Sequence, residues 1–245
     1  MIRGSVILII SFANEAGLNW AINKDIGRYQ LVWKVDGDDI YADNCHEAGK
    51  RVRQQTGAVI VGVDQHEFDD DIRQARPLIS PRHQNRKIIK AEDILHKNRF
   101  GFGNTFFDPS AVREIAPNNH VGMADLSPIF NGALDWLFYT PLILAGAKAV
   151  YTDETHVLYR QHEQNELGNN SKGVEHNIRA KAEFYPEIVK RANLTESDAE
   201  IYSNLGEIFE SQVQILDDPE FNGLREQLML ENYNLNQRCG LPLEW

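Results

Sequence analysis

The segment LVWKVDGDDIYADN, residues 31–44, contains the abrupt change from apolar to acidic side chains on which the fold assignment depends. Its apolar beginning predicts a strand, and Asp36, Asp38 and Asp39 follow directly, with a glycine after the first of them. Neighbouring carboxylates repel one another, so the cluster needs a positive charge to balance it. Two carboxylates at D-x-D spacing on a turn converge on one point, which suits Mg²⁺ or Mn²⁺. The same residues also fit an ordinary acidic loop, so the cluster alone leaves both interpretations open.

Strands and helices alternate on both sides of this segment. Runs of β-branched and aliphatic residues at 6–12, 29–35 and 58–64 predict strands. Helices are expected at 17–25 and at 44–57, the second of them ending at a glycine. This strand–helix–strand alternation indicates an α/β layer architecture with parallel pairing of strands.

The middle of the chain begins with a long polar excursion at 69–100, in which a short helix is expected at 92–97. Loops of this length inside a domain are usually functional or mobile. The elements expected after it are a strand that ends near 107, a helix at 109–116, a buried helix at 134–145 and a strand–turn–strand unit at 147–162.

After residue 170 the pattern becomes helical. Apolar residues between 196 and 216 fall at helical spacing and predict an amphipathic helix. We therefore divide the chain into an α/β domain at 1–170 and an acidic helical region at 171–245.

Charge is distributed unevenly along the chain, whose formal net charge is −11. That sign argues against general nucleic-acid binding, which requires a basic surface. Residues 171–245 contain 14 acidic and 7 basic side chains, whereas residues 73–99 contain 8 basic and 2 acidic ones. The basic stretch is either a solvated loop or a site that grips an acceptor phosphate, such as that of a lipid diphosphate.

The cysteines and the hydropathy pattern bear on location. Cys45 and Cys239 form neither a disulfide framework nor a CxxC motif, so a reducing cytosol is the expected compartment. The longest apolar stretch, at 136–151, is interrupted by proline, glycine and lysine, so neither a signal peptide nor a membrane span is expected. We expect a cytoplasmic protein and leave peripheral contact with the inner face of a membrane open.

Three blocks of the sequence resemble the family 2 glycosyltransferases, which have the GT-A fold. NEAGLNWAINKDIGRYQLVWKVDGDDIYADN, at 14–44, resembles the helix and strand that end in the family's Asp-Ala-Asp-Asp motif. GFGNTFFDPSAVREI, at 101–115, resembles the segment that lines the donor-sugar and acceptor cleft. ALDWLFYTPLILAGAKAVYTDETHVLYRQHEQNELG, at 133–168, resembles the segment from the catalytic Asp to the closing Tyr-Arg-x-His motif. The blocks occur in the family's order and cover about residues 5–168.

The resemblance implies a GT-A-like, Rossmann-like α/β fold with a mixed, mainly parallel sheet flanked by helices and a C-terminal helical appendage. It also implies a metal-dependent, inverting glycosyltransferase that moves a sugar from a nucleotide-sugar donor to a saccharide or lipid-linked acceptor. Cell-envelope or capsular polysaccharide synthesis is the setting that it implies.

Within this resemblance the acidic motif would hold Mn²⁺ or Mg²⁺ on the leaving diphosphate. Asp36 and Asp38 are the implied metal ligands, Asp38 being the more direct one. His162, in the closing motif, would add a third ligand or a contact with the diphosphate. The implied donor-binding residues are Asp36, Asp38, Asp39, Asn104 and Arg160.

Asp135 corresponds to the general base that removes the proton from the acceptor hydroxyl. It opens a helix, and its apolar neighbours Leu134 and Trp136 are expected to raise its pKa toward a useful range. A single displacement with such a base inverts the anomeric centre. A carboxylate at this position is also a common helix cap, so a structural role is the alternative.

The acidic motif departs from the family pattern because it arrives as early as residue 36. We favour the absence of the first strand–helix–strand unit over an internal deletion. That unit usually recognises the nucleotide base, so a non-catalytic GT-A-derived binding or scaffold domain, or an inactive fragment, is the alternative function. An exposed parallel strand edge favours association, so we expect either a homo-oligomer or a helix of the acidic tail over that edge.

Overall fold

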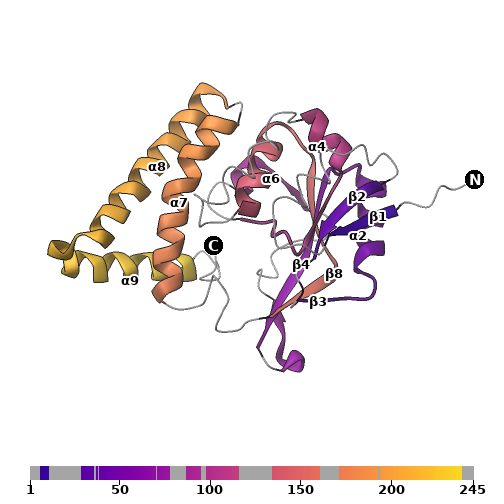
Figure 1. The fold of residues 1–245 in the computed structure, drawn as a ribbon, viewed down its shortest axis with the longest axis horizontal. Helices are drawn as coiled ribbons and strands as arrows, with labels where there is room; N and C mark the ends of the chain where they lie inside the picture. Colours follow the sequence, from indigo (N-terminus) through magenta and orange to yellow (C-terminus); the bar gives the residue numbers. More distant parts are fainter. Residues whose placement is uncertain are drawn as a thin grey trace, which may run out of the picture.

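The computed structural model of the chain describes residues 6–10, 29–35, 37, 39–69, 71–77, 87–94, 98–115, 134–160, 171–192 and 194–238. Within these residues one sheet carries helices on both faces, and three C-terminal helices stand beside it (Figure 1). The helix expected at 17–25 and the side chains of Asp36, Asp38 and His162 lie outside the described residues.

The sheet has the strand order β1-β2-β7-β4-β8-β3, with β5 paired to β4 and β6 paired to β8. The strands are β1 (Val6–Ile10), β2 (Tyr29–Lys34), β3 (Ile40–Tyr41), β4 (Ile60–Phe68), β5 (Arg76–Pro77), β6 (Lys87–Ile89), β7 (Thr105–Phe107) and β8 (Ala149–Arg160). The long excursion expected as a loop therefore contains β5, β6, a 3-10 turn η1 (Ile72–Gln74) and the short helix α3 (Ala91–Ile94).

The mixed α/β fold that the sequence predicted is confirmed, with a smaller share of parallel pairing than expected. Strand β1 runs parallel to β2, and β4 runs parallel to β8. The other five pairings of the described strands are antiparallel. The difference arises because β7, which follows the glycine-marked turn, inserts between β2 and β4 in the opposite direction.

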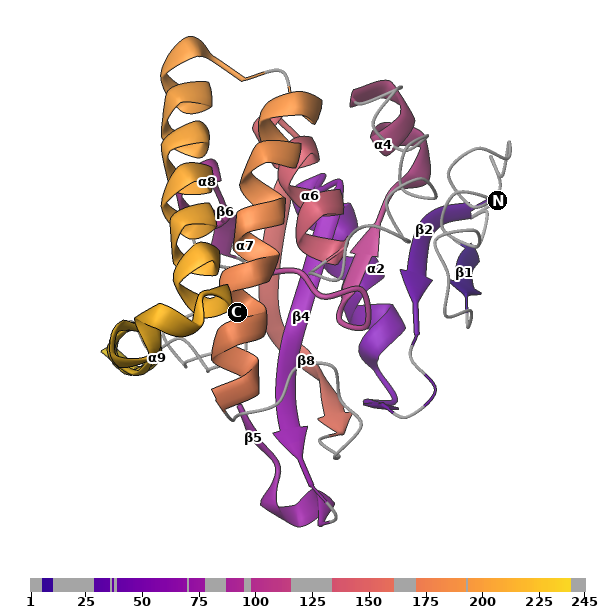
Figure 2. The same cartoon turned by 60° about the vertical axis from the view of Figure 1, so that its left-hand side comes forward.

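Two apolar layers cover the two faces of the sheet, because successive side chains of a strand point to opposite sides. Trp33 and Val61 face the layer under α2 (Cys45–Thr56). Val32 and Ile60 face the layer that contains side chains of α4 (Pro109–Ile115) and α6 (Leu134–Leu144). Figure 2 shows these helices from a second direction.

Helix α2 has the boundaries that its sequence predicts. It follows Asn44 and ends at Gly57, which adopts the left-handed conformation at φ 67° and donates its N–H to Arg53 O at 2.7 Å. Gly49 faces the sheet, and a Cβ there would lie 2.8 Å from the ring of Phe106. Only glycine therefore allows this approach of helix to strand.

Strand β8 corrects the prediction of a strand–turn–strand unit. It is one strand of 12 residues that pairs with β4 on both sides of a register shift, where Val63 pairs with Thr152 and Asp64 with His156. The intervening residues bulge toward α2 instead of reversing the chain. Arg51 of α2 contacts Glu154 of this bulge at 2.7 Å, and no local sequence pattern reveals this contact.

The C-terminal region consists of α7 (Ser171–Arg191), α8 (Glu196–Asp217), the 3-10 turn η2 (Pro219–Phe221) and α9 (Asn222–Arg238). Its contact with the sheet domain is made on α6, where the ring of Trp136 stacks on that of Phe184 with centroids 3.9 Å apart. Figures 1 and 2 both show α7 and α8 on the opposite side of the molecule from β1. The described tail helices therefore cover α6 and not the β1 edge, contrary to one of the alternatives above.

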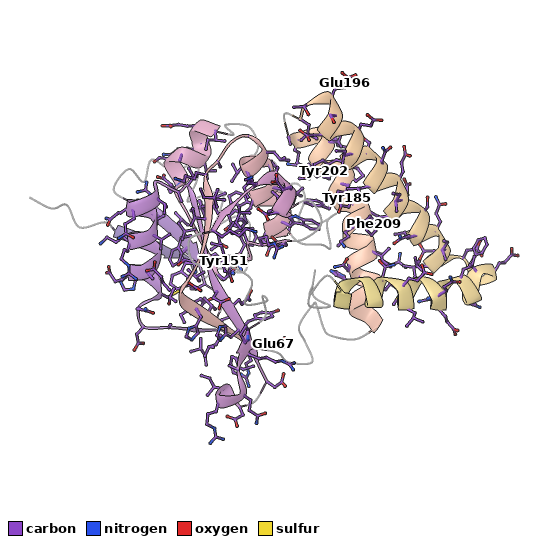
Figure 3. All side chains as sticks on the ribbon, turned by 180° about the vertical axis from the view of Figure 1, so that it is seen from behind. Glu67, Tyr151, Tyr185, Glu196, Tyr202 and Phe209 are labelled. Carbon is purple, nitrogen blue, oxygen red and sulfur yellow. The ribbon has the colours of Figure 1, made fainter. Side chains whose placement is uncertain are left out.

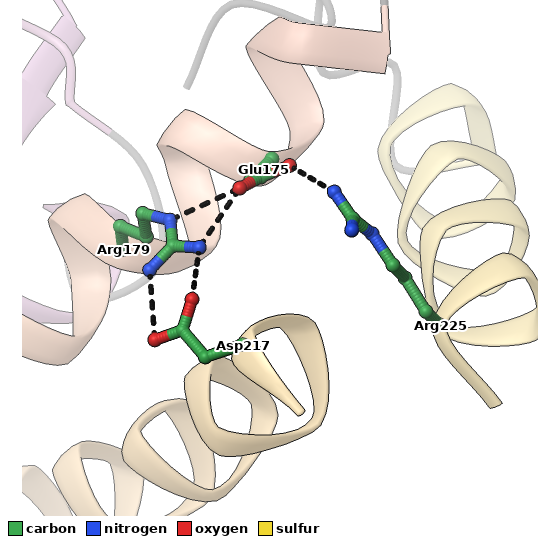
Figure 4. Close-up of polar contacts among 4 residues, drawn as sticks. All are labelled: Glu175, Arg179, Asp217 and Arg225. Atoms are coloured by element: carbon green, nitrogen blue, oxygen red, sulfur yellow. Dashed lines mark hydrogen bonds and ion pairs between the residues drawn. The ribbon is translucent and has the colours of Figure 1, made fainter. Parts of the chain in front are cut away.

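A charged network joins the three tail helices at one end (Figure 4). Arg179 of α7 contacts Glu175 at 2.8 Å and Asp217 of α8 at 2.6 Å, and Arg225 of α9 contacts the other oxygen of Glu175 at 2.9 Å. The side chains are partly exposed, so the network fixes how the helices meet more than it stabilises them. No described helix combines the length and apolar character needed to cross a membrane.

Candidate functional site

Asp135 lies in the first turn of α6, as the sequence predicted. Its Oδ1 accepts a hydrogen bond from the N–H of Trp136 at 2.7 Å, and its carboxylate also accepts from the N–H of Phe102. Burial raises the pKa of the Asp135 carboxyl to about 6, although these backbone donors and the charge of Lys34 favour the ionised form. A carboxylate that titrates near neutrality is suited to take a proton from a substrate.

The turn at 101–104 lies directly against this carboxylate. A Cβ on Gly101 would lie 3.7 Å from Asp135 Oδ2 and 3.0 Å from Asn104 Oδ1, so both side chains converge on the position that the glycine leaves open. Asn104 is held by a hydrogen bond from its Nδ2 to Val63 O at 2.9 Å. The structure thus brings together two of the residues that the sequence singled out, Asn104 and Asp135.

The end of β2 reaches the same turn. Trp33 donates its indole N–H to Gly103 O at 2.9 Å, and Lys34 Nζ lies 5.6 Å from the centre of the Phe102 ring. The acidic motif begins two residues after Lys34. The chain therefore enters that motif beside the Asp135 carboxylate.

The other end of the acidic motif lies against β8. Asp39 Oδ1 is 3.4 Å from the backbone N of Arg160, and β3 continues from there by pairing Ile40 with Leu158. Asp39 and Arg160, 121 residues apart, are thereby brought together, and their role in donor binding stays a prediction.

The predicted metal ligands Asp36, Asp38 and His162 all lie outside the described residues. Among the residues that are described, no three His, Cys, Asp or Glu side chains are arranged to hold a metal ion. The cation thus stays a prediction that rests on the sequence.

In the described parts of the basic stretch at 73–99, four basic side chains have acidic partners close by. Ion pairs join Arg73 to Asp71, Arg76 to Glu67, Lys87 to Asp93 and Lys90 to Glu92. These four side chains fit the interpretation of a solvated segment, and the phosphate grip stays an alternative for the rest of the stretch.

One polar cluster near the site was missed at the sequence level. Asp64 accepts from the hydroxyl of Tyr151 at 2.8 Å and lies 2.9 Å from His66 Nε2, and the ring of His66 stacks on that of His156. The predicted strand at 58–64 stopped short of it, whereas β4 continues to Phe68. The alternation of Asp64 and His66 on one face of a longer strand was the available signal.

The sequence matches no protein-family model and no curated protein. The structure is similar to crystal structures of S. aureus TarS, a glycosyltransferase of the GT-A type. The TarS fragment 1–349 matches with a TM-score of 0.52 at 11% identity, over 89% of this chain and 58% of that one. A second structure of S. aureus TarS matches with a TM-score of 0.50 at 8% identity, over 84% and 32% of the two chains.

This chain spans little more than half the length of the TarS fragments that it matches. At such low identity the likeness bears on architecture alone. The mixed α/β architecture with its partly parallel sheet matches that of the TarS fragment, and the chain therefore has a GT-A-like fold.

Proposed function

We propose that this protein is an inverting glycosyltransferase of the family 2 type, with Asp135 as its general base. The observation that carries the proposal is the partly buried Asp135 carboxylate, held against the open turn at Gly101 beside the strand that leads into the acidic motif. The GT-A-like fold supports it, because that fold hosts sugar transfer from nucleotide donors in the matched proteins.

Asp135 would accept the proton of the acceptor hydroxyl while the oxygen of that hydroxyl forms a bond to the anomeric carbon of the donor sugar. The bond from that carbon to the diphosphate breaks at the same time, and the nucleoside diphosphate leaves with the electron pair. Attack from the face opposite to the leaving group inverts the anomeric centre. The backbone N–H groups of Trp136 and Phe102 hold the carboxylate in place, and the absent side chain at Gly101 leaves room beside it.

The donor would lie at the acidic motif, with Asp39 and Arg160 at one end of it and Asn104 at the other. A divalent cation held by Asp36 and Asp38, with His162 as a further ligand, would act as a Lewis acid on the leaving diphosphate. A saccharide or lipid-linked acceptor in envelope or capsular polysaccharide synthesis is the substrate that we propose, at a cytoplasmic location.

Nucleotide binding tests this function. Calorimetry with UDP and GDP, each with and without Mn²⁺, should detect binding that requires the metal and that weakens at least about 10-fold in Asp38→Ala. UDP is the first nucleotide to test, because the TarS fragment has been crystallised with UDP and with UDP-GlcNAc.

Asp153→Ala is the matched control, since this carboxylate is exposed on β8. Its binding should equal that of the wild type. Absence of binding at millimolar nucleotide, together with Asp38→Ala indistinguishable from the wild type, would leave the non-catalytic scaffold as the better description.

A further inference from the structure

The polar cluster of Asp64, His66, Tyr151 and His156 has no role in the chemistry described above. It lies on the sheet face that α6 covers, since Tyr151 and Ile60 belong to the same apolar layer as Phe138 of α6. Figure 3 labels Tyr151 near the middle of the sheet and Glu67 farther along β4. Asp64 and His66 occupy the positions of β4 between these two levels.

The cluster adjoins the candidate active site through bonded neighbours. Asn104, which shares the opening at Gly101 with Asp135, donates to the carbonyl of Val63, and Asp64 is the next residue of the strand. On the same face, the ring of Phe100 lies against Tyr139 of α6 and fills the space beside Gly62, where it meets Tyr151. Tyr139 also feels the charge of Asp135, so Asn104, Phe100 and Tyr139 connect the candidate base to this cluster.

The cluster presents unused hydrogen-bonding groups. His66 contacts Asp64 through Nε2, and neither its Nδ1 nor the ring nitrogens of His156 make a hydrogen bond to the described part of the chain. The side chains of Asp64 and His66 are 20% and 25% exposed, so a ligand can reach them. Both rings are partly buried, so their ring nitrogens are only partly open to water.

The charges of the cluster indicate which class of ligand it can bind. Asp64 contributes a negative charge, and burial together with the neighbouring His66 lowers the pKa of His156, so this imidazole is neutral at pH 7. A phosphate or carboxylate would be repelled by the Asp64 charge, and Arg99, a described cation whose charge also acts on Tyr151, is held by Asp93. Sugar hydroxyls both donate and accept, which matches a carboxylate beside two imidazole rings. No metal-binding arrangement involves these side chains within the described ranges.

We propose that Asp64, His66, Tyr151 and His156 form the acceptor subsite and bind the hydroxyl groups of an uncharged saccharide. The inference rests on the proposed function and narrows it, because a saccharide whose reactive end carries a phosphate is excluded from this position. Asp64 would accept hydrogen bonds from sugar hydroxyls, and the ring nitrogens of His66 and His156 would fix the orientation of the sugar. Tyr151 positions Asp64 through its hydroxyl.

The rate of UDP release from UDP-GlcNAc in the presence of Mn²⁺ distinguishes the proposed function from the proposed subsite. Hydrolysis of the donor by water needs no saccharide acceptor, so it tests the function alone. The probes are the methyl glycosides of glucose, galactose, mannose and N-acetylglucosamine, with glycerol 3-phosphate as the anionic comparison. At least one neutral glycoside should accelerate UDP release in the wild type with saturation, and glycerol 3-phosphate should not.

His156→Phe keeps a ring for the stack and removes both nitrogens, and His46→Phe on the exposed face of α2 is the matched control. The acceleration by glycoside, relative to the hydrolysis of the same variant, should fall at least about 10-fold in His156→Phe and stay unchanged in His46→Phe. An unchanged acceleration in His156→Phe would overturn the subsite. So would a wild type that hydrolyses the donor yet responds only to glycerol 3-phosphate, or to none of the probes.

Absence of both UDP release and UDP binding would instead refute the proposed function. If His156→Phe folds poorly, NMR of the wild-type protein tests the subsite without any need for turnover. The imidazole proton NMR signals of His66 and His156 should shift on addition of the effective glycoside, and those of His46 should not. Equal shifts of all three would contradict the subsite.

Discussion

Replacing Asp135 by Asn tests the ionisation on which its role as a base depends. Burial raises the pKa of the Asp135 carboxyl from 3.8 to about 6, so the folded protein holds this proton more tightly than the unfolded chain does. The contribution to stability is therefore full below about pH 4 and is lost as the pH rises toward 6. At about 1.4 kcal/mol per pKa unit the whole shift corresponds to about 3 kcal/mol. Solvent that reaches this partly buried side chain reduces the expected effect to about 1–3 kcal/mol.

Urea unfolding of the wild type and of Asp135→Asn, at about pH 4.5 and about pH 7.5, measures this effect. The asparagine keeps an oxygen that can accept from the N–H of Trp136 and removes the titrating proton. The free energy of unfolding of the variant, relative to the wild type, should therefore be about 1–3 kcal/mol higher at the upper pH than at the lower. Asp153→Asn, on the exposed side of β8, should show no such change. If the free energy of unfolding of Asp135→Asn differed from that of the wild type by the same amount at both pH values, the argument that burial raises the pKa of this carboxyl would be refuted.

Three further substitutions test other parts of the structure. Gly101→Ala places a methyl group 3.0 Å from Asn104 Oδ1 and 3.7 Å from Asp135 Oδ2, so the asparagine must shift, and the rate of UDP release should fall about 10- to 100-fold; an unaltered rate would contradict the geometry of the turn. Phe184→Ala removes the stack on the tryptophan of α6 and should cost about 3–5 kcal/mol in urea unfolding, whereas Phe221→Ala, at a side chain that is 42% exposed, should cost under about 1 kcal/mol; equal losses would show that the tail is not held by this stack. Arg51→Ala breaks an ion pair at the bulge of β8 and should cost about 0.5–1 kcal/mol in the same assay, and a loss near 3 kcal/mol would mean that β8 depends on it.

Local patterns predicted the elements whose residues carry their own signals. The apolar run that ends at the acidic motif is β2, and the helix bounded by Asn44 and Gly57 is α2. Asp135 was expected in the first turn of a buried helix, and it lies there. Asn104 and Asp135 were each singled out through a resemblance of ordered blocks, whereas their position beside the same turn is a finding of the structure.

Other features depend on contacts between distant segments, which no local pattern encodes. Strand β8 appeared to contain a turn because Asp153 and Glu154 are polar, yet α2 anchors that bulge from more than 100 residues away. The antiparallel insertion of β7 between β2 and β4 is likewise a long-range choice. The cluster around Asp64 was missed because a polar stretch following an apolar run reads as the end of a strand.

The tail illustrates the same division. Helical spacing of apolar residues predicted α8, and its bounds of Glu196–Asp217 agree with the expected 196–216. The face on which the tail packs was left open, because the stack of Trp136 on Phe184 joins residues whose patterns are each compatible with several partners. Whether 1–170 and 171–245 behave as separate domains stays a prediction.

The central claim, that Asp135 is the base of a glycosyl transfer, is tested most directly by UDP release in the wild type and in Asp135→Asn. The assay uses UDP-GlcNAc, Mn²⁺ and the glycoside that accelerates the wild type, and calorimetry measures UDP binding to both proteins. Asp135→Asn should release UDP at least about 100-fold more slowly and bind UDP with the affinity of the wild type. Release at the rate of the wild type, with binding intact, would contradict the claim.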